Sequence, residues 1–261
     1  MGDKIENSYL TEMIGMEVKS YKGGPESWHG LLLDVQSDYI ALYNRKNGYI
    51  YLRTEFIKSV VANTAPPHMN QSFNTLLRNA EIEDDFEEVL ENLIDENVQI
   101  NLGGPESRRG TLLAVPDDYL VLHNEKDGII YYNLEHVKSV SVMIENEDNN
   151  EQENEDQEME DVQIQNFIDV DGLNRLFKRL KFTYVMINRG PESVEGVLVD
   201  VRDNVLTLIA RDEVLRVNSF QVKSIRQRMQ ASNNNSNNQG NSTEGSILSH
   251  RRMQQARKRG H

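Results

Sequence analysis

The chain has 261 residues, of which 38% are hydrophobic, and a formal net charge of −14 at pH 7. It contains no cysteine, which excludes disulfides and thiolate metal sites. No apolar run approaches the roughly 20 residues of a membrane span, and residues 1–6 lack the apolar core of a secretion signal. We therefore expect a protein that is made in the cytoplasm and does not enter a membrane.

Charge is distributed unevenly along the chain. Residues 145–161 hold ten acidic residues and no basic one, whereas residues 251–259 are strongly basic. Such blocks mark solvated segments, so we expect an acidic disordered linker at 145–164. Residues 229–261 are rich in Asn and Ser and predict a disordered tail with a basic end. The acidic body lacks the basic patch that marks a nucleic-acid surface.

A four-residue phrase, Gly-Pro-Glu-Ser, occurs three times and organises the rest of the chain. The second copy follows the first by 80 residues, and the third follows the second by 86. Each copy ends three residues before a glycine that opens an aliphatic run. A fixed period of this kind predicts a repeated structural element. The copies are Gly24, Pro25, Glu26 and Ser27; Gly104, Pro105, Glu106 and Ser107; and Gly190, Pro191, Glu192 and Ser193.

The period divides the chain into three units of about 60 residues. We expect unit one at 1–64, unit two at 82–144 and unit three at 165–228, with a linker at 65–81 between the first two. A unit of this size buries only about 60% of the surface of its unfolded chain. Each unit is therefore expected to gain stability by packing on its siblings.

A short amphipathic helix is expected at the start of each unit. Acidic residues suited to the helix N-terminus precede the apolar stripe in units two and three, and Ser8 precedes it in unit one. The stripes are Leu10, Met13 and Ile14; Phe86, Val89, Leu90, Leu93 and Ile94; and Leu173, Leu176, Phe177 and Leu180. In the first linker, Phe73, Leu76 and Leu77 predict one further helical turn.

Five strands are expected after each helix. The second strand begins near Trp28, Arg108 or Val194, and its apolar residues change parity partway along, which indicates a bulge. The third and fourth strands alternate and are joined by a hairpin at Asn47-Gly48 and at Asp127-Gly128. Unit three has a hairpin one residue shorter.

A helix followed by five short, curved antiparallel strands resembles the Sm-like domains within the SH3-like small barrels. The Gly-x-Leu pattern early in the second strand is also similar to the Sm signature. The predicted fold class is therefore mainly β with short helices: three tandem Sm-like (SH3-like) small barrels, each a helix plus five antiparallel strands. Function does not follow from this resemblance.

The repeated phrase allows three interpretations. Gly and Pro are typical of a tight turn, and a plain turn is the simplest account. Retention of Glu and Ser in all three copies favours a loop that docks a partner. A local ion pair is the third account, because each unit ends with a basic residue, which is Lys58, Lys138 or Lys223. We keep the phrase as the candidate interaction loop.

The chain shows no constellation that carries catalysis. Its six histidines occur singly, and there is no nucleophile elbow or phosphate-binding loop. We therefore expect no catalytic residue, no metal site and no cofactor, and a protein that is not an enzyme.

RNA binding is the alternative that the fold class raises. Sm-type readers hold bases with an Asn after the second strand and an Arg-Gly pair before the fifth. The corresponding places here are Asp38-Tyr39, Asp118-Tyr119 and Asn204-Val205, each followed later by Lys-Ser. Without a basic groove, the phosphate contacts that dominate affinity are missing. We therefore expect no nucleic-acid partner.

The units also resemble a narrower family. Gly103 to Ser107, then Gly110, Asp118-Tyr119, Ile130 to Tyr132 and Glu135 to Ser139 form a pattern similar to the spore coat protein B family of endospore-forming bacilli. The resemblance covers about residues 1–228. It implies a non-enzymatic component of the outer spore coat, made in the mother-cell cytoplasm, deposited on the spore surface and partnered by other coat proteins.

The tail departs from the family pattern. Family members end in a long Ser/Lys/Arg-rich tail that a coat kinase phosphorylates, so the resemblance implies that kinase as a partner. The tail here is short and Asn-rich, with scattered serines at Ser232, Ser236, Ser242, Ser246 and Ser249. The opposite charges of the acidic linker and the basic end also predict weak self-association that fades with salt.

Overall fold

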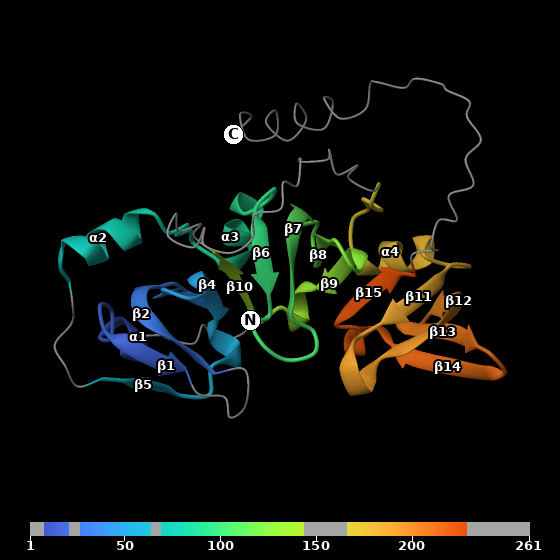
Figure 1. Cartoon of the computed structure of the whole chain (residues 1–261). Coiled ribbons are helices and arrows are strands. Elements are labelled where there is room, and N and C mark those ends of the chain that lie inside the picture. Colours follow the sequence, from blue (N-terminus) through green and yellow to red (C-terminus); the bar gives the residue numbers. More distant parts are fainter. Residues whose placement is uncertain (1–7, 21–26, 64–68, 144–165, 229–261) are drawn as a thin grey trace, which may run out of the picture. The chain divides into compact units, whose positions relative to one another are not determined.

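We describe a computed structural model of the chain, which covers residues 8–20, 27–63, 69–143 and 166–228. The structure is mainly β, with few and short helices (Figure 1). None of the helices in these ranges is long and apolar enough to cross a membrane. The acidic linker, the tail and Gly24 to Glu26 lie outside the described residues.

The described elements recur in one order. Unit one contains α1 (Ser8–Thr11), β1 (Glu17–Ser20), β2 (Trp28–Val35), β3 (Tyr39–Asn44), β4 (Gly48–Arg53), η1 (Thr54–Phe56) and β5 (Val60–Ala62). The helix α2 (Gln71–Arg78) lies in the linker, where the sequence predicts one turn. Unit two contains α3 (Phe86–Asn92), β6 (Asn97–Ile100), β7 (Arg108–Ala114), β8 (Tyr119–Asn124), β9 (Gly128–Asn133), η2 (Leu134–His136) and β10 (Ser139–Val142).

Unit three repeats that order. It contains α4 (Leu173–Arg179), β11 (Tyr184–Ile187), η4 (Gly190–Glu192), β12 (Val194–Arg202), β13 (Val205–Ala210), β14 (Glu213–Asn218), η5 (Ser219–Gln221) and β15 (Ser224–Gln227). The predicted bulge in the second strand is present in all three units, as a register shift after Leu32, Leu112 and Leu198. The hairpin glycines Gly48 and Gly128 take the positive φ angles that this turn type requires.

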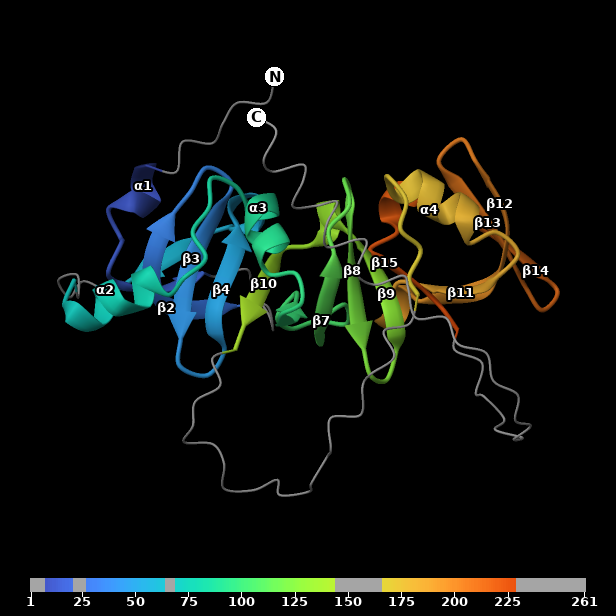
Figure 2. The same ribbon diagram turned by 90° about the horizontal axis from the view of Figure 1, so that it is seen from above.

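All described strands belong to one antiparallel sheet of 15 strands. Its order is β14-β13-β12-β11-β15-β9-β8-β7-β6-β10-β4-β3-β2-β1-β5. Within each unit the strands lie in the order fifth, first, second, third, fourth. Two ladders then join the units: the fourth strand of one unit pairs with the fifth strand of the next, as β4 with β10 and β9 with β15 (Figure 2).

The prediction of three tandem Sm-like small barrels is not confirmed, because the sheet does not close within the described strands. The physical reason lies in the two ladders between units. The outer edges of β4 and β9 pair with a strand of the following unit. Neither edge is therefore available to pair with the fifth strand of its own unit and close a barrel. Among the described strands, the sheet ends at β14 on one side and at β5 on the other.

The apolar cores also extend across the joints between units. One core cluster contains Tyr39 and Tyr51 of unit one together with Phe86, Leu90 and other residues of unit two. A second cluster contains Tyr119 and Tyr131 of unit two together with the helix stripe of unit three. Each of these tyrosines lies on a strand whose other face packs in its own unit.

A pair of tyrosines and an aspartate hold each following unit in place. The hydroxyl of Tyr119 donates to the carbonyl of Val170 at 2.8 Å and accepts from its N–H at 3.3 Å. Tyr131 accepts from the N–H of Ile168 at 2.8 Å. Asp118 accepts from the N–H of Leu173 at 2.6 Å and so caps α4 from another unit.

The same arrangement occurs one joint earlier. Tyr39 bonds both backbone groups of Glu83, Tyr51 accepts from the N–H of Glu81, and Asp38 accepts from the N–H of Phe86. We call Asp38, Tyr39 and Tyr51, and Asp118, Tyr119 and Tyr131, the two staples. Burial raises the pKa of Tyr39 and of Tyr119 to about 12, so both hydroxyls keep their protons at neutral pH.

We expect Tyr119→Phe to lower the free energy of unfolding by about 1–2 kcal/mol, because the partly buried backbone groups of Val170 lose a partner while ring packing is kept. Urea denaturation of the full chain measures this. The control is Tyr43→Phe, whose ring packs on Tyr49 with centroids 5.4 Å apart and whose hydroxyl forms no hydrogen bond with the described residues. Equal losses in the two variants would contradict the staple.

Candidate interaction site

The structure describes two complete copies of the repeated phrase, and both form a turn. The N–H of Ser107 donates to the carbonyl of Gly104 at 3.3 Å, and that of Ser193 donates to the carbonyl of Gly190 at 3.1 Å. Gly104 and Gly190 both have positive φ angles. Of the first copy, only Ser27 lies within the described residues, and it is partly exposed.

The two glutamates of these turns have opposite environments. Glu106 is buried, with 8% of its surface exposed, and its side chain crosses to unit three. One carboxylate oxygen accepts from the backbone N–H of Arg189 at 2.7 Å, and the other accepts from the hydroxyl of Ser224 at 2.7 Å. The backbone carbonyl of Glu106 accepts from the hydroxyl of Tyr132.

The close approach of Gly190 to Pro105 lets Glu106 reach unit three. A side chain at Gly190 would place its Cβ atom 2.8 Å from the Cβ atom of Pro105, so the phrases of units two and three touch. The glycine therefore serves as a contact surface as well as a turn residue. Burial raises the pKa of the Glu106 carboxyl above its ordinary value, and the bond from Ser224 opposes that shift.

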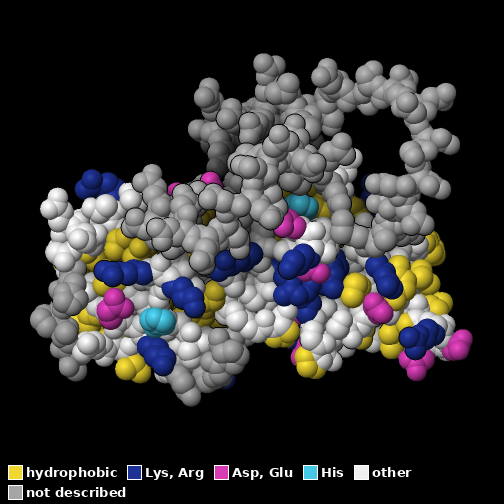
Figure 3. Space-filling model, in the orientation of Figure 1, with side chains coloured by type: hydrophobic (Ala, Val, Ile, Leu, Met, Phe, Trp, Pro, Cys, Tyr) yellow, Lys and Arg dark blue, Asp and Glu magenta, His cyan; other side chains and the backbone are white. Residues whose placement is uncertain are grey.

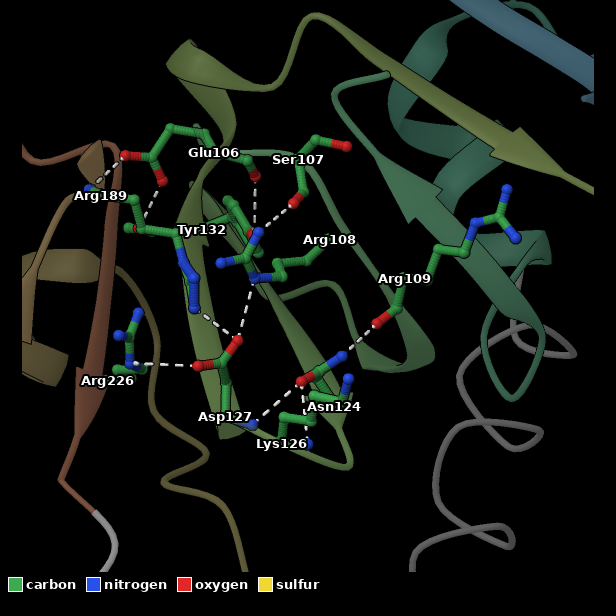
Figure 4. A network of polar contacts seen from close by, with 11 residues as sticks. Glu106, Ser107, Arg108, Arg109, Asn124, Lys126, Asp127, Tyr132, Arg189 and Arg226 are labelled. Atoms are coloured by element: carbon green, nitrogen blue, oxygen red, sulfur yellow. Dashed lines mark hydrogen bonds and ion pairs between the residues drawn. The ribbon is translucent and has the colours of Figure 1, made fainter. Parts of the chain in front are cut away.

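A cluster of arginines surrounds Asp127 beside this contact (Figure 4). Asp127 lies in the hairpin between β8 and β9 and pairs with Arg108 at 2.9 Å and with Arg189. Arg226 approaches it from β15 at 3.8 Å. Basic side chains gather around acidic ones over β9 on the face shown in Figure 3. Two of these three arginines belong to unit three, so the ion pairs also join units.

The third copy of the phrase makes no contact of this kind with the described residues. The Glu192 side chain is 61% exposed and forms an ion pair with Lys223 of its own unit at 2.5 Å. That hydrogen bond lowers the pKa of Glu192. The local pair with the closing lysine is therefore present in unit three, while in unit two Glu106 is directed into the joint instead.

The sequence did not reveal three asparagines, of which two hold the closing strand of their own unit and one bonds across a joint. Asn101 and Asn188 take positive φ angles, and each accepts from the N–H of the closing lysine and donates to a carbonyl of the 3-10 turn before it. Asn133 donates across the joint to the carbonyl of Val222. An Asn after the first strand of units two and three was the available signal, because Asn adopts this conformation more readily than most residues.

The site is suited to binding protein backbone. The two carboxylate oxygens of Glu106 accept from a backbone N–H and from a hydroxyl. The arginines beside it pair with the charge of Asp127. Among the described residues, no group of three or more His, Cys, Asp or Glu could hold a metal ion. Together the fold and the site define a β protein whose units are joined through strand edges and loop contacts.

Comparison with known proteins gives the family. No family model matches the chain. The chain is 38% identical over 220 residues to Spore coat protein B of Bacillus subtilis (strain 168), which covers 84% of this chain and 54% of that protein. The chain therefore spans about half the length of the curated relative that it matches. It belongs to the spore coat protein B family, as its repeated pattern predicted, and this membership places it in the spore coat.

We expect the unfolding free energy of Glu106→Gln, relative to that of the unaltered chain, to increase as pH rises. The pKa of folded Glu106 is raised, so its contribution to stability is fully present below the unfolded pKa and is lost as pH rises through the folded pKa. Gln keeps an acceptor for Arg189 and a donor for Ser224 without titrating. Urea denaturation from acidic to neutral pH measures the difference in unfolding free energy.

Glu192→Gln is the matched control, with the opposite sign. The pKa of folded Glu192 is lowered, so its contribution is present above the unfolded pKa and is lost as pH falls through the folded pKa. Because the pair is exposed, we expect Gln to cost less than about 1 kcal/mol at neutral pH. The same pH trend in both variants would show that the two glutamates do not differ as described.

Proposed function

We propose that this chain is a non-enzymatic structural component of the outer spore coat that assembles through protein–protein contacts of its three units. Family membership supports the coat role. On this proposal the protein is made in the mother cell, and its partners are other coat proteins.

One observation carries the assembly proposal. The Gly-Pro-Glu-Ser turn of unit two contacts unit three through Glu106. The same turn recurs in unit three, where Pro191, Glu192 and Ser193 are all exposed. Glu106 in unit two shows how such a loop binds: it accepts from a backbone N–H and from a serine hydroxyl of a neighbouring unit. We propose that Gly190 to Ser193 is the loop available to a partner, and we keep Gly24 to Ser27 as a candidate interaction loop on the sequence alone.

We also propose that each unit is an Sm-like (SH3-like) small barrel opened into a common sheet. Three features support this relation: the helix at the start of each unit, the strand order of fifth, first, second, third and fourth, and the bulge in the second strand. The RNA-binding or adaptor role that the same fold class raises is not supported, because Asp38, Tyr39, Asp118 and Tyr119 are occupied in the staples.

The tail and the acidic linker add two further proposals. Their opposite charges would support weak self-association that salt suppresses. The serines of the tail would be the substrates if a coat kinase acts on this chain. Both segments lie outside the described residues, so these proposals rest on the sequence.

Incorporation into the coat tests the proposed function. A fluorescent fusion of the chain, followed through sporulation of an endospore-forming bacillus, should form a ring around the spore. Glu192→Ala should lower coat fluorescence several-fold with little change in melting temperature, because its ion pair is exposed. The control is Glu195→Ala, another exposed glutamate on β12.

The contrary outcomes are separate. Diffuse fluorescence of the unaltered chain, or signal that ribonuclease removes, would contradict the structural coat role and favour the adaptor or RNA-binding role. Normal incorporation of Glu192→Ala would leave the coat role intact but show that the exposed loop is not the contact.

A further inference from the structure

The two edge strands of the described sheet carry exposed apolar side chains. Val214 on β14 is 63% exposed, and Val61 on β5 is 62% exposed. Phe220, in the turn after β14, is 55% exposed. A sheet edge also presents unpaired N–H and carbonyl groups, which makes it a template for another strand. Both ends of the sheet therefore have the properties of binding edges.

Positions related by the repeats show what such an edge looks like when it is covered. Tyr49 on β4 corresponds to Val214 on β14, and it is only 7% exposed because β10 of unit two lies against its strand. The burial of β4 and β9 is almost complete, whereas every residue of β14 is exposed or partly exposed. The difference is that no described strand lies beyond β14.

The two internal joints use one register. Ser139 lies opposite Leu52, and the corresponding Ser224 lies opposite Tyr132. The next two pairs also correspond: Val140 with Tyr51 and Ile225 with Tyr131, then Ser141 with Ile50 and Arg226 with Ile130. A joint between units is thus a reproducible element of this fold, formed by the fourth strand of one unit with the fifth strand of another.

The free edges are the two halves of such a joint. The edge strand β14 is the fourth strand of unit three, and β5 is the fifth strand of unit one. We propose that β14 of one molecule pairs with β5 of a second copy of the same chain. This inference deepens the proposed function, on which its biological role rests, by naming the partner of one contact.

The register of the new joint is set by the internal joints. Val217, Arg216 and Leu215 occupy the places of Leu52, Tyr51 and Ile50, and β5 occupies the place of β10. The pairs across the new joint are Ser59 with Val217, Val60 with Arg216, Val61 with Leu215, and Ala62 with Val214. The ladder covers Leu215 and Val217, which pack on the core of unit three and are only half-buried without it.

The exposed phrase lies at the same joint. Glu106 binds Ser224 of the following unit, so Glu192 corresponds to the residue that meets Ser59 of the second copy. In the single chain, Glu192 instead pairs with its own Lys223, an exposed contact that contributes little to stability. Replacing this ion pair with a buried contact to the second copy therefore costs little free energy.

The joint between copies is weaker than the internal ones because it lacks the staple. Unit three has Asn204, Val205 and Arg216 where units one and two have Asp, Tyr and Tyr. The internal joints are also tethered by the chain, which raises their effective concentration. A joint of this kind forms reversibly and becomes populated where the protein is concentrated, as in a layer. Because the contact is head to tail, it generates a ring or an open filament.

Cysteine cross-linking of the full chain tests the register, since the natural chain has no cysteine. Purified Ala62→Cys and Val214→Cys proteins are mixed and oxidised. Residues directly opposite in an antiparallel pair have Cα atoms about 4.5–5.5 Å apart, which suits a disulfide. We expect a covalent dimer in the mixture. The control mixture is Ala62→Cys with Glu213→Cys, whose neighbouring side chain points to the other face, and it should cross-link at least about tenfold less.

Each further outcome decides between occupants of the edge. Efficient dimers of Val214→Cys alone would show that β14 pairs with itself and would overturn the proposal. The cross-link should persist in about 1 M salt, where charges are screened beyond about 3 Å. Loss of the cross-link there, or after deletion of 229–261, would assign association to the charged segments instead. If either cysteine variant unfolds, Val61→Cys with Leu215→Cys tests the same register.

Sedimentation of the unaltered chain gives an independent readout. The average mass of the sedimenting species should rise with protein concentration. Val214→Lys should raise the concentration for half-association at least about tenfold, because a lysine on an edge strand opposes pairing. The melting temperature of the variant should not change. A chain that stays monomeric and never cross-links, yet enters the coat, would overturn this inference and leave the proposed function standing. Absence from the coat would remove the proposed function whatever the cross-linking shows.

Discussion

The ladder between the fourth strand of one unit and the fifth strand of the next is the contact on which the fold depends. Each ladder covers a strand that would otherwise be a sheet edge. It also lets Tyr51 and Tyr131 contribute to the core of the unit that comes next. Units of about 60 residues bury too little surface to be stable with ease, so sharing cores is the physical advantage of joining them.

The staples turn that shared edge into a defined joint. Asp38 and Asp118 satisfy the backbone N–H groups at the start of the following unit, where a helix has no internal partner for them. The helix stripes then pack over the preceding unit. Because each unit supplies part of the next unit's helix cap and core, loosening one joint removes contacts from both neighbours, and the three units are expected to unfold with strong coupling.

Much of the local structure could be predicted from the sequence, whereas the joints could not. The period located the second strands, the bulges and the hairpins, since all of these depend on local patterns. Pairing between units depends on distant strands and leaves a weaker signal. That signal was present in β4, where Tyr49 to Leu52 is continuously apolar and so indicates burial on both faces. In contrast, β14 carries the charged residues Glu213 and Arg216, as an edge strand does.

Identical loops acquired different roles for the same reason. Glu106 and Glu192 occupy the same turn, yet one is buried and the other forms an exposed ion pair. Nothing within the four residues distinguishes them. The difference comes from the neighbouring unit: unit three presents Ser224 and the N–H of Arg189 to Glu106, while no described unit lies beyond Glu192. A repeated motif in such a protein is therefore a binding element whose state depends on whether a neighbouring unit covers it, and of the two copies that the structure describes in full, the one in unit three is left open.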